Sequence, residues 1–299
     1  MKKKGSAIRK TVRENIQGWL VVGPVILYYL IFGLYPLYIL FKNSVYSQRN
    51  MFSPMTYVGL GNFVDIFTKP EYYNLLLNTT YIALFTIGIS FFLGLLLAHL
   101  FTAKIKGTAF FRTVFYIPVV VSMAVVSQIV NVWLSPTHGT LNNLFGTDIQ
   151  WTQSVFWMYF WLIVICIWKG LGATVILYVA GLSSISPEMY EAAEIDGAGR
   201  ISRFFHISMP LLRPMHVFVL ITSIIGAFNI FEPVQLITKG GPDGKTKVVM
   251  FMIYDEAIKN GNMGMGSALS IVILLILMGL TALNMRFGTE KADVNPKRR

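Results

Sequence analysis

Residues 186–214 read SPEMYEAAEIDGAGRISRFFHISMPLLRP, a polar and charged stretch that lies between two long apolar runs. Ser186 is a residue type favoured at a helix N-cap, and Pro187 suits the first helical position, where its missing N–H is no loss. Glu188 and Glu191 would place negative charge at the positive end of the helix dipole. The pattern therefore predicts a short helix that begins directly after Ser186.

A second short helix is expected after a turn. Gly197 and Gly199 supply the turn, because glycine adopts backbone conformations that other residues avoid. Apolar residues then recur at helical spacing from Ile201 onward, and Pro210 and Pro214 are expected to end the second helix. Two short amphipathic helices at a bend predict a surface feature within an otherwise apolar chain.

The hairpin also carries a set of residues at fixed offsets, namely Glu191, Ala192, Ala193, Asp196, Gly197, Ala198, Phe204 and Pro210. At these positions the chain resembles the cytoplasmic EAA loop of permease subunits of bacterial ATP-binding cassette (ABC) importers, in the maltose-type, binding-protein-dependent form. The resemblance implies that the hairpin is a pair of coupling helices that docks into a groove on an ATPase subunit. The residues alone also allow an amphipathic hairpin that lies on the membrane surface.

Two further segments extend the resemblance over most of the chain. Residues 57–63 are similar to the G-L-x-N-F signature of sugar permeases, and residues 236–242 are similar to their L-T-x-G-G-P segment. The large external domain of one maltose-type subunit is not matched. The resemblance implies a sugar or oligosaccharide as the solute, without saying which one.

Composition indicates an integral membrane protein. Of the 299 residues, 55% are hydrophobic and 13% are charged, and the mean hydropathy is +0.60. These values lie outside the range of soluble domains. A net charge of +11 would suggest nucleic acid as the partner of a soluble protein, but in a membrane protein the placement of the charges matters more. Cys166 is the only cysteine, so an intrachain disulfide is impossible.

Six apolar runs are long enough to span a bilayer: 19–41, 79–102, 110–134, 155–182, 215–238 and 268–287. The first run is too long for a signal-peptide core and has no A-x-A cleavage site, which predicts a retained membrane helix. The expected fold is therefore an all-α polytopic protein with six transmembrane helices. Its parts are a tail (1–17), a permease domain (18–287, with the coupling loop 186–214) and a second tail (288–299).

The distribution of positive charge predicts the orientation in the membrane. The two tails, the loop around Lys104 and Arg112 and the hairpin together hold 17 Lys and Arg residues, whereas the loops on the opposite side hold seven. Positively charged loops remain in the cytoplasm. Both termini and the hairpin are therefore expected in the cytoplasm of a bacterial cell, where an ATPase would meet the hairpin.

Two charged residues inside the apolar runs are candidates for a solute path, because such charges are costly in a bilayer. They are Lys169 and Glu232, whose depths differ by about 12 Å at the helical rise per residue, too far for a direct ion pair. We expect both to face water. Lys169 would suit an acidic sugar, but a lysine can equally bond neutral hydroxyls or the carbonyl end of a helix.

Small or polar residues form stripes on the fourth and fifth runs, which flank the hairpin. The predicted pathway residues are Cys166, Lys169, Gly170, Ala173, Ser223, Gly226, Ala227, Asn229 and Ile230. The resemblance implies that solute is held between these two helices. Small residues in membrane helices also serve close helix packing, so the stripes alone leave both readings open.

Catalytic motifs are missing from the chain. The segment Gly241–Thr246 falls short of a phosphate-binding loop, because the position that needs the first glycine is Lys239. Metal-hydrolase and serine-hydrolase motifs are also absent, and no metal site is expected. The chain is therefore predicted to be a transport subunit that itself binds no cofactor, with ATP and Mg²⁺ in partner ATPase subunits.

The expected partners follow from the resemblance. They are a second, homologous permease subunit, two ATP-binding cassette subunits, a solute-binding protein outside the membrane, and the lipid bilayer, with no nucleic acid. A secondary carrier or channel that works without an ATPase is the alternative, but the inverted repeats with broken helices that it favours are not found. A membrane scaffold or enzyme has no residue-level support.

Overall fold

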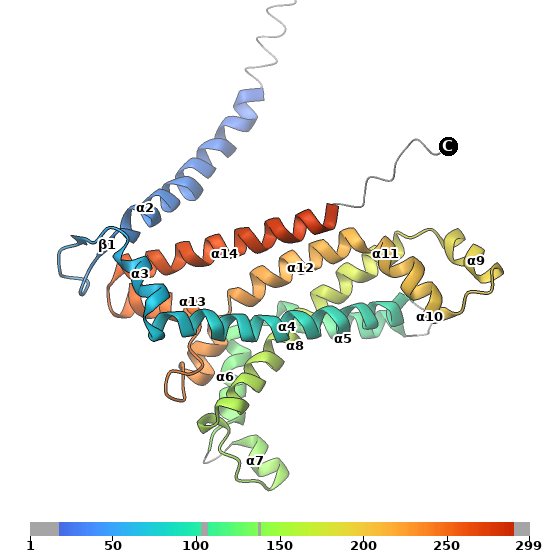
Figure 1. The fold of residues 1–299 in the computed structure, drawn as a ribbon. Helices are drawn as coiled ribbons and strands as arrows, with labels where there is room; N and C mark the ends of the chain where they lie inside the picture. Colours follow the sequence, from blue (N-terminus) through green and yellow to red (C-terminus); the bar gives the residue numbers. More distant parts are fainter. Residues whose placement is uncertain (1–17, 103–106, 137–138, 290–299) are drawn as a thin grey trace, which may run out of the picture.

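The computed structural model describes residues 18–102, 107–136 and 139–289. The predicted tail 1–17, residues 290–299 of the predicted tail 288–299, and Lys104 of the charge count lie outside the described residues. The long helices that form the body of the molecule are α4 (Pro70–Thr102), α8 (Val155–Ser183), α12 (Arg213–Phe228) and α14 (Met263–Thr289) (Figure 1). Helix α4 packs most extensively on α8, while α12 contacts α4, α8 and α14.

The remaining elements are shorter. Before α8 they are η1 (Leu30–Leu34), α2 (Tyr35–Ser44), β1 (Tyr46–Ser47), β2 (Thr56–Tyr57), α3 (Gly61–Thr68), α5 (Thr108–Val120), α6 (Met123–Trp133), α7 (Thr140–Phe145) and η2 (Trp151–Gln153). After α8 they are α9 (Pro187–Ile195), α10 (Arg200–Arg203), η3 (Phe204–Ser208), α11 (Met209–Leu211), η4 (Val234–Thr238), α13 (Val249–Tyr254) and η5 (Asp255–Lys259). The two strands pair in antiparallel fashion, with Tyr46 opposite Tyr57.

Glycine permits the close approach of the central helices. A Cβ on Gly94 of α4 would lie 2.5 Å from the side chain of Thr174 on α8, and a Cβ on Gly172 would lie 2.1 Å from the carbonyl oxygen of Phe115 on α5. Real side chains do not tolerate such distances, so these two positions fix how near α4 and α5 come to α8. Tyr178, fully buried on α8, belongs to the cluster of buried side chains near the hairpin.

Four helices are long and apolar enough to cross a membrane, and each of two bent helix pairs passes the same test. The fold is thus that of an all-helical polytopic membrane protein with four to six spans in its described part. Span two is longer than predicted, because α4 already begins at Pro70. An extension beyond the apolar run is compatible with the burial of Tyr72 and Leu75 in the cluster formed with α3, α13 and α14.

The third span is not the continuous helix that the apolar run predicted. Helices α5 and α6 meet at an angle of 91°, with Val121 and Ser122 in extended conformation between them. Pro118 lies near the end of α5, where it removes one N–H from the helix. Span five also differs, because α12 ends at Phe228 and a separate π-helical turn, η4, follows.

The second short helix ends between the two prolines that were predicted to end it. Helical structure continues from α10 through η3 and α11 and ends at Leu211, one residue after Pro210 and before Pro214. A proline inside an α-helix clashes with the carbonyl four residues earlier. The wider π turn of η3, in which the Met209 N–H bonds to the Phe204 carbonyl, gives Pro210 the space it needs.

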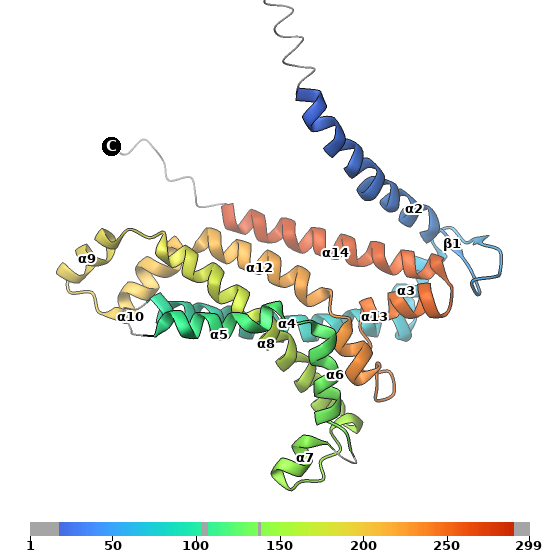
Figure 2. The ribbon, with the colours of Figure 1, turned by 180° about the vertical axis from the view of Figure 1, so that it is seen from behind.

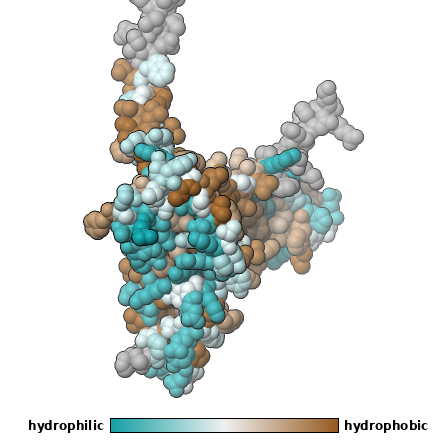
Figure 3. Space-filling model, turned by 60° about the vertical axis from the view of Figure 1, so that its left-hand side comes forward, coloured by the Kyte–Doolittle hydropathy of each residue, from teal (hydrophilic) through white to brown (hydrophobic). Residues whose placement is uncertain are grey.

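The first helix, Gly18–Ser44, leaves the body at an angle and points away from it in both views (Figures 1 and 2). The last part of this helix, α2, contacts α14. The most apolar 18-residue stretch of Gly18–Ser44 is not buried at all. Figure 3 shows the contrast between this largely hydrophobic helix and the hydrophilic end of the molecule from which it rises. The helix presents an apolar surface to its surroundings.

Candidate functional site

A cavity of about 310 Å³ opens between α4, α8 and α12, next to the break between α5 and α6. Its size falls in the range of small-molecule sites. All nine residues predicted for the pathway line this cavity: Cys166, Lys169, Gly170, Ala173, Ser223, Gly226, Ala227, Asn229 and Ile230. Glu232, the second charged candidate, lines it as well. The stripes on the fourth and fifth runs thus face one shared space.

Lys169 does not point a free ammonium group into this cavity. Its Nζ donates to the carbonyl oxygens of Pro118 at 3.1 Å and Val119 at 2.9 Å, and also to that of Val121. These carbonyls lie at the C-terminal end of α5 and in the break that follows it, where the last carbonyls of a helix lack the usual N–H four residues later. The Pro118 carbonyl also accepts from the Val121 N–H at 3.3 Å. An ammonium group has three N–H donors, and all three are used here.

Glu232 is exposed at the cavity and forms no ion pair with any residue that the structure describes. Lys169, the other charged candidate within the apolar runs, is engaged with α5. The expectation that the two charges do not form a direct pair therefore holds for the described residues. Glu232 leaves the cavity with an uncompensated negative charge at one end.

Two residues that the sequence analysis missed also line the cavity. Thr86 and Ser90 lie one turn apart on α4, with exposures of only 9% and 5%, and within the described chain neither hydroxyl has a hydrogen-bond partner. Buried hydroxyls in helices usually donate to the carbonyl four residues earlier, as Thr79 does to Leu75. A polar pair at i and i+4 inside an apolar run was the signal that could have revealed them.

In contrast to the cavity, the hairpin 186–214 is a projection at one end of the molecule (Figures 1 and 2). Helix α9 begins at Pro187 with Ser186 at the N-cap, as predicted, although the Ser186 side chain makes no capping bond. Helix α9 ends in a Schellman motif. The Ala198 N–H bonds to the Ala193 carbonyl at 2.8 Å, and the Gly197 N–H bonds to the Glu194 carbonyl at 3.0 Å.

Gly197 occupies the left-handed position of this motif, with φ of +80°. The sequence Asp196-Gly197-Ala198 therefore defines the end of α9 and the direction in which the chain leaves it. Gly199, in contrast, has a negative φ that other residues also adopt. Of the glycine pair predicted to make the turn, only Gly197 is conformationally required.

Side-chain contacts tie the two arms of the hairpin together. The hydroxyls of Tyr190 and Ser208 are 2.9 Å apart. On the outside, the Arg203 guanidinium donates to the Glu194 carboxylate at 2.7 Å. The hairpin is thereby a preformed unit, not a flexible loop.

The residues to which the family resemblance gives a coupling role are spread along this unit. Glu191, Ala192 and Ala193 lie on α9, Asp196 to Ala198 in the turn, Phe204 at the start of η3 and Pro210 in α11. Ile195 and Ile201, which lie on either side of the turn, are 87% and 77% exposed. Large apolar side chains in such positions are typical of a protein–protein contact surface.

The motif segments in the loops away from the hairpin have structural roles. Asn62 is buried and its Nδ2 donates to the carbonyls of Ser44 at 2.8 Å and Tyr46 at 2.7 Å, which holds the first helix and β1 against α3. Asn78 on α4 likewise donates to the carbonyls of Lys245 at 3.0 Å and Lys247 at 2.9 Å. The partial phosphate-loop pattern thus lies in a loop that is bound to α4.

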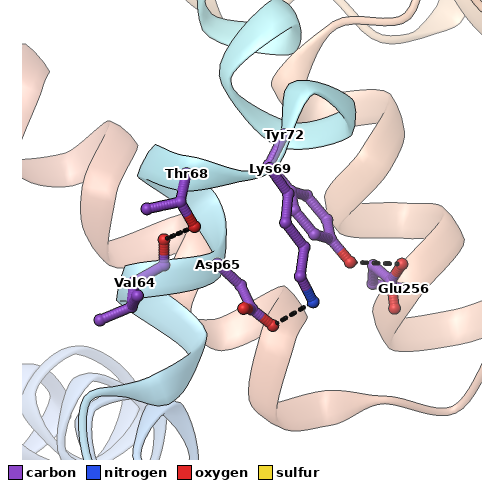
Figure 4. Close-up of polar contacts among 6 residues, drawn as sticks. All are labelled: Val64, Asp65, Thr68, Lys69, Tyr72 and Glu256. Atoms are coloured by element: carbon purple, nitrogen blue, oxygen red, sulfur yellow. Dashed lines mark hydrogen bonds and ion pairs between the residues drawn. The ribbon is translucent and has the colours of Figure 1, made fainter.

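A buried acid lies at the same end of the molecule. The Tyr72 hydroxyl donates to Glu256 Oε1 at 3.4 Å, whereas the nearby pair of Asp65 and Lys69 is exposed (Figure 4). Burial raises the pKa of Glu256, and the negative charge of Glu71 raises it further, while bonds from side chains such as Asn260 oppose the shift. This cluster was not singled out from the sequence.

The fold and the cavity define a class of protein: a polytopic helical membrane protein with a polar cavity between its spans and a preformed hairpin at one end. The family model described as "Binding-protein-dependent transport system inner membrane component" matches residues 55–287. The chain belongs to this family. It is therefore a permease subunit of a binding-protein-dependent ABC importer, a multi-pass component of the bacterial inner membrane that transports and does not catalyse.

Similar proteins cover nearly the whole chain. The probable ABC transporter permease protein YurN of Bacillus subtilis is 35% identical over 272 residues, with 86% of this chain and 92% of that protein covered. The arabinooligosaccharides transport system permease protein AraP of Halalkalibacterium halodurans is 29% identical, with 94% and 90% covered. A chain of a bacterial ABC transporter that imports the acidic polysaccharide alginate has the same fold, with a TM-score of 0.83, 22% identity and 95% and 99% covered.

Proposed function

We propose that this chain forms half of the translocation path for a sugar or oligosaccharide and passes the energy of ATP hydrolysis to that path through the hairpin 186–214. The observation that carries the proposal is the convergence of nine predicted pathway residues on one cavity, two helices of which, α8 and α12, are joined by the hairpin. A movement of the hairpin would reach the cavity directly along these two helices.

The carbohydrate part of the proposal draws support from the relatives and from the cavity. AraP is named for arabinooligosaccharides, and LacF of Rhizobium radiobacter, 30% identical, for lactose. The cavity wall offers the hydroxyl and amide groups of Ser223 and Asn229 among small side chains. Such groups suit a solute that is rich in hydroxyls.

The ATPase contact is proposed for the surface of α9 and the turn. Glu191 is exposed and makes no bond to any described residue, so its carboxylate is free to meet a basic side chain of an ATPase. Ala192 and Ala193 let a partner surface approach closely, and Ile195 and Ile201 supply apolar contact area. ATP and Mg²⁺ would be held by two partner ATPase subunits.

The other partners are proposed on similar grounds. The exposed apolar helix Gly18–Ser44 would be covered by lipid and by a second, homologous permease subunit, giving a heterodimer. The binding protein would meet the end that carries α3, β1 and β2, opposite the hairpin (Figure 1). This arrangement places both termini and the hairpin in the cytoplasm, as the charge distribution predicts.

The proposal is tested by purifying the chain from its host in detergent and identifying what accompanies it. An ATPase subunit and a second permease should copurify, and ATP hydrolysis by the complex should rise when the binding protein and a sugar are added. Solute transport by the chain alone, without an ATPase, would overturn the proposal in favour of a secondary carrier.

A further inference from the structure

We propose that Lys169 is a positioning residue that holds the break between α5 and α6, and that the cavity consequently takes a neutral, hydroxyl-rich solute and not an anionic one. This inference rests on the proposed function, since it names the class of solute that the same cavity would carry. It concerns the charge of that solute, which the family leaves open.

The first step is the state of the lysine. A lysine that binds anionic solutes must offer its N–H donors to them, yet Lys169 already donates to Pro118, Val119 and Val121. Three carbonyl dipoles at the negative end of a helix also offset its charge. A solute carboxylate or phosphate would have to displace these bonds and leave the carbonyls of Val119 and Val121 without this donor, which costs free energy.

The second step is what these bonds do for the cavity. They join α8 to the end of α5 at the point where the chain turns by 91° into α6. Met123, the first residue of α6, lines the cavity directly beyond this break. Because the break is held in this way, Met123 lies in the cavity wall. Lys169 thus shapes the cavity through α5 and α6, and not by binding the solute.

The third step is the charge that remains. With the N–H donors of Lys169 engaged, the charged lining group that bonds to no described residue is the exposed carboxylate of Glu232. A negative solute would be repelled by this carboxylate, whereas sugar hydroxyls can donate to it. Repulsion between like charges thus disfavours an anion at this end of the cavity.

The fourth step is the polar wall of α4. The unpartnered hydroxyls of Thr86 and Ser90 are covered in this conformation, and rotation about χ1 would turn them toward the cavity that their side chains line. Neutral hydroxyl groups discriminate little between charges but bond well to other hydroxyls. Together with Asn229 they form a wall suited to an uncharged polyol.

The test uses the assembled importer, with its ATPase subunits and second permease, in lipid nanodiscs. Cys166 is replaced by serine, and one reporter cysteine is introduced at Gly226 or at Met123. A Cβ at Gly226 meets no atom within 4 Å, so Gly226→Cys adds a thiol without a clash. The rate of labelling by N-ethylmaleimide is measured with neutral probes (maltose, lactose, arabinotriose) and anionic probes (trigalacturonate, glycerol 3-phosphate).

We expect at least one neutral probe to slow the labelling of Gly226→Cys and the anionic probes to have little effect. Glu232→Gln should lower the concentration of anionic probe needed for half protection by about tenfold. Lys169→Gln should change the labelling rate of Met123→Cys without any probe and leave that of Gly226→Cys unchanged. Lys169→Arg, which keeps donors for the carbonyls, should restore the Met123→Cys rate.

A second comparison isolates the hydroxyls of α4. Thr86→Val should raise the half-protecting concentration of the effective neutral probe by about three- to tenfold, the loss expected for one hydrogen bond. Thr222→Val is the matched control, because the Thr222 hydroxyl lines the same cavity but already bonds to the Phe218 and Val219 carbonyls. An equal effect of both variants would contradict the role of Thr86.

The inference is overturned on its own if the anionic probes protect Gly226→Cys better than the neutral ones, or if Lys169→Gln abolishes protection by anionic probes alone. In either case the cavity is still a solute path and the proposed function stands. Failure of every probe to protect Gly226→Cys in an importer that hydrolyses ATP would instead remove the cavity from the path, and the inference with it.

Discussion

The Arg203 guanidinium donates to the Glu194 carboxylate at 2.7 Å across the turn of the hairpin, whereas Glu191, one turn earlier on α9, bonds to no described residue. The two acids share a helix and an exposed setting but differ in what they contact. Glu194 has its partner within the chain. Glu191 is left for a partner outside it.

The two acids therefore predict different phenotypes. Glu191→Ala should weaken the binding of the ATPase subunit by about 1.5–3 kcal/mol, the range for a charge-assisted hydrogen bond. Glu194→Ala removes an exposed ion pair and should cost about 1 kcal/mol or less. Titration of the purified permease dimer with the ATPase subunit, followed by fluorescence anisotropy, measures both. Equal losses would show that only the total negative charge of α9 affects ATPase binding, and not the position of Glu191.

Filling the cavity should stop transport without preventing assembly. Gly170 and Gly226 line the cavity, and a Cβ at either meets no atom within 4 Å, so Gly170→Trp and Gly226→Trp would occupy the cavity instead of distorting the helices. Uptake of radiolabelled sugar into proteoliposomes should fall to background. Gly279→Trp on α14, where a Cβ also meets no atom, is the control that should transport normally. Normal uptake in both cavity variants would indicate that the small residues of α8 and α12 serve helix packing and do not line the solute path.

The buried carboxyl group of Glu256 predicts a pH dependence of stability. Because the pKa of Glu256 is raised in the folded protein, the folded state binds a proton that the unfolded state lacks between pH 4.5 and the raised value. The contribution of Glu256 to the free energy of unfolding thus falls as the pH rises through that range, and it stays low at higher pH. Glu256→Gln keeps the hydrogen bonds but not the charge.

Thermal unfolding of the purified complex, followed from below pH 4.5 to neutral pH, measures this contribution. Glu256→Gln should raise the Tm at neutral pH and flatten its pH dependence. Asp65→Asn, which removes an exposed acid paired with Lys69 at 2.7 Å, should do neither. A lower Tm for Glu256→Gln at neutral pH would mean that the carboxylate is stabilising despite its burial.

The proposed orientation predicts which exposed sites a membrane-impermeant maleimide reaches in intact cells. With Cys166 replaced, single cysteines at Phe52, Asn143 and Lys245 should be labelled, since all three are exposed in the loops assigned to the outside. A cysteine at Ile195 in the hairpin should be labelled only in inverted vesicles. The reverse pattern would invert the topology.

The hairpin could be predicted almost to the residue, because its signals are local. Ser186 and Pro187 mark the start of α9 and Gly197 marks its end, each through the conformation of its own backbone. The end at Pro210 and Pro214 was predicted as well, but the π turn of η3 before Pro210 was not. Local rules describe a residue and its neighbours, but not an adjustment of the turn before it.

The break in the third span was only partly visible in the sequence, because Pro118 is a local signal for it but the contact that holds it comes from a distant residue. The residues from Val119 to Val121 are as apolar as any in the run, and the ammonium group that satisfies their carbonyls comes from Lys169 on another helix. The cavity was predicted in part, since small and polar residues on α8 and α12 are visible in sequence. Its α4 wall, with Thr86, was not.

The most direct test of the central claim, that the hairpin couples the path to the ATPase, is the solute-stimulated ATP hydrolysis of a Gly197→Val importer. Gly197 has φ of +80°, where a side chain costs about 1–2 kcal/mol and a β-branched one is an outlier. Gly199→Val is the matched control, because Gly199 has φ of −67° and equal space around it.

We expect the Gly197→Val permease to insert and pair with its partner subunit, while its ATP hydrolysis no longer rises on addition of binding protein and sugar. Gly199→Val should keep most of the stimulation. If Gly197→Val shows full stimulation and normal uptake, the end of α9 need not be held in this geometry, and the assignment of the hairpin as the coupling element is contradicted.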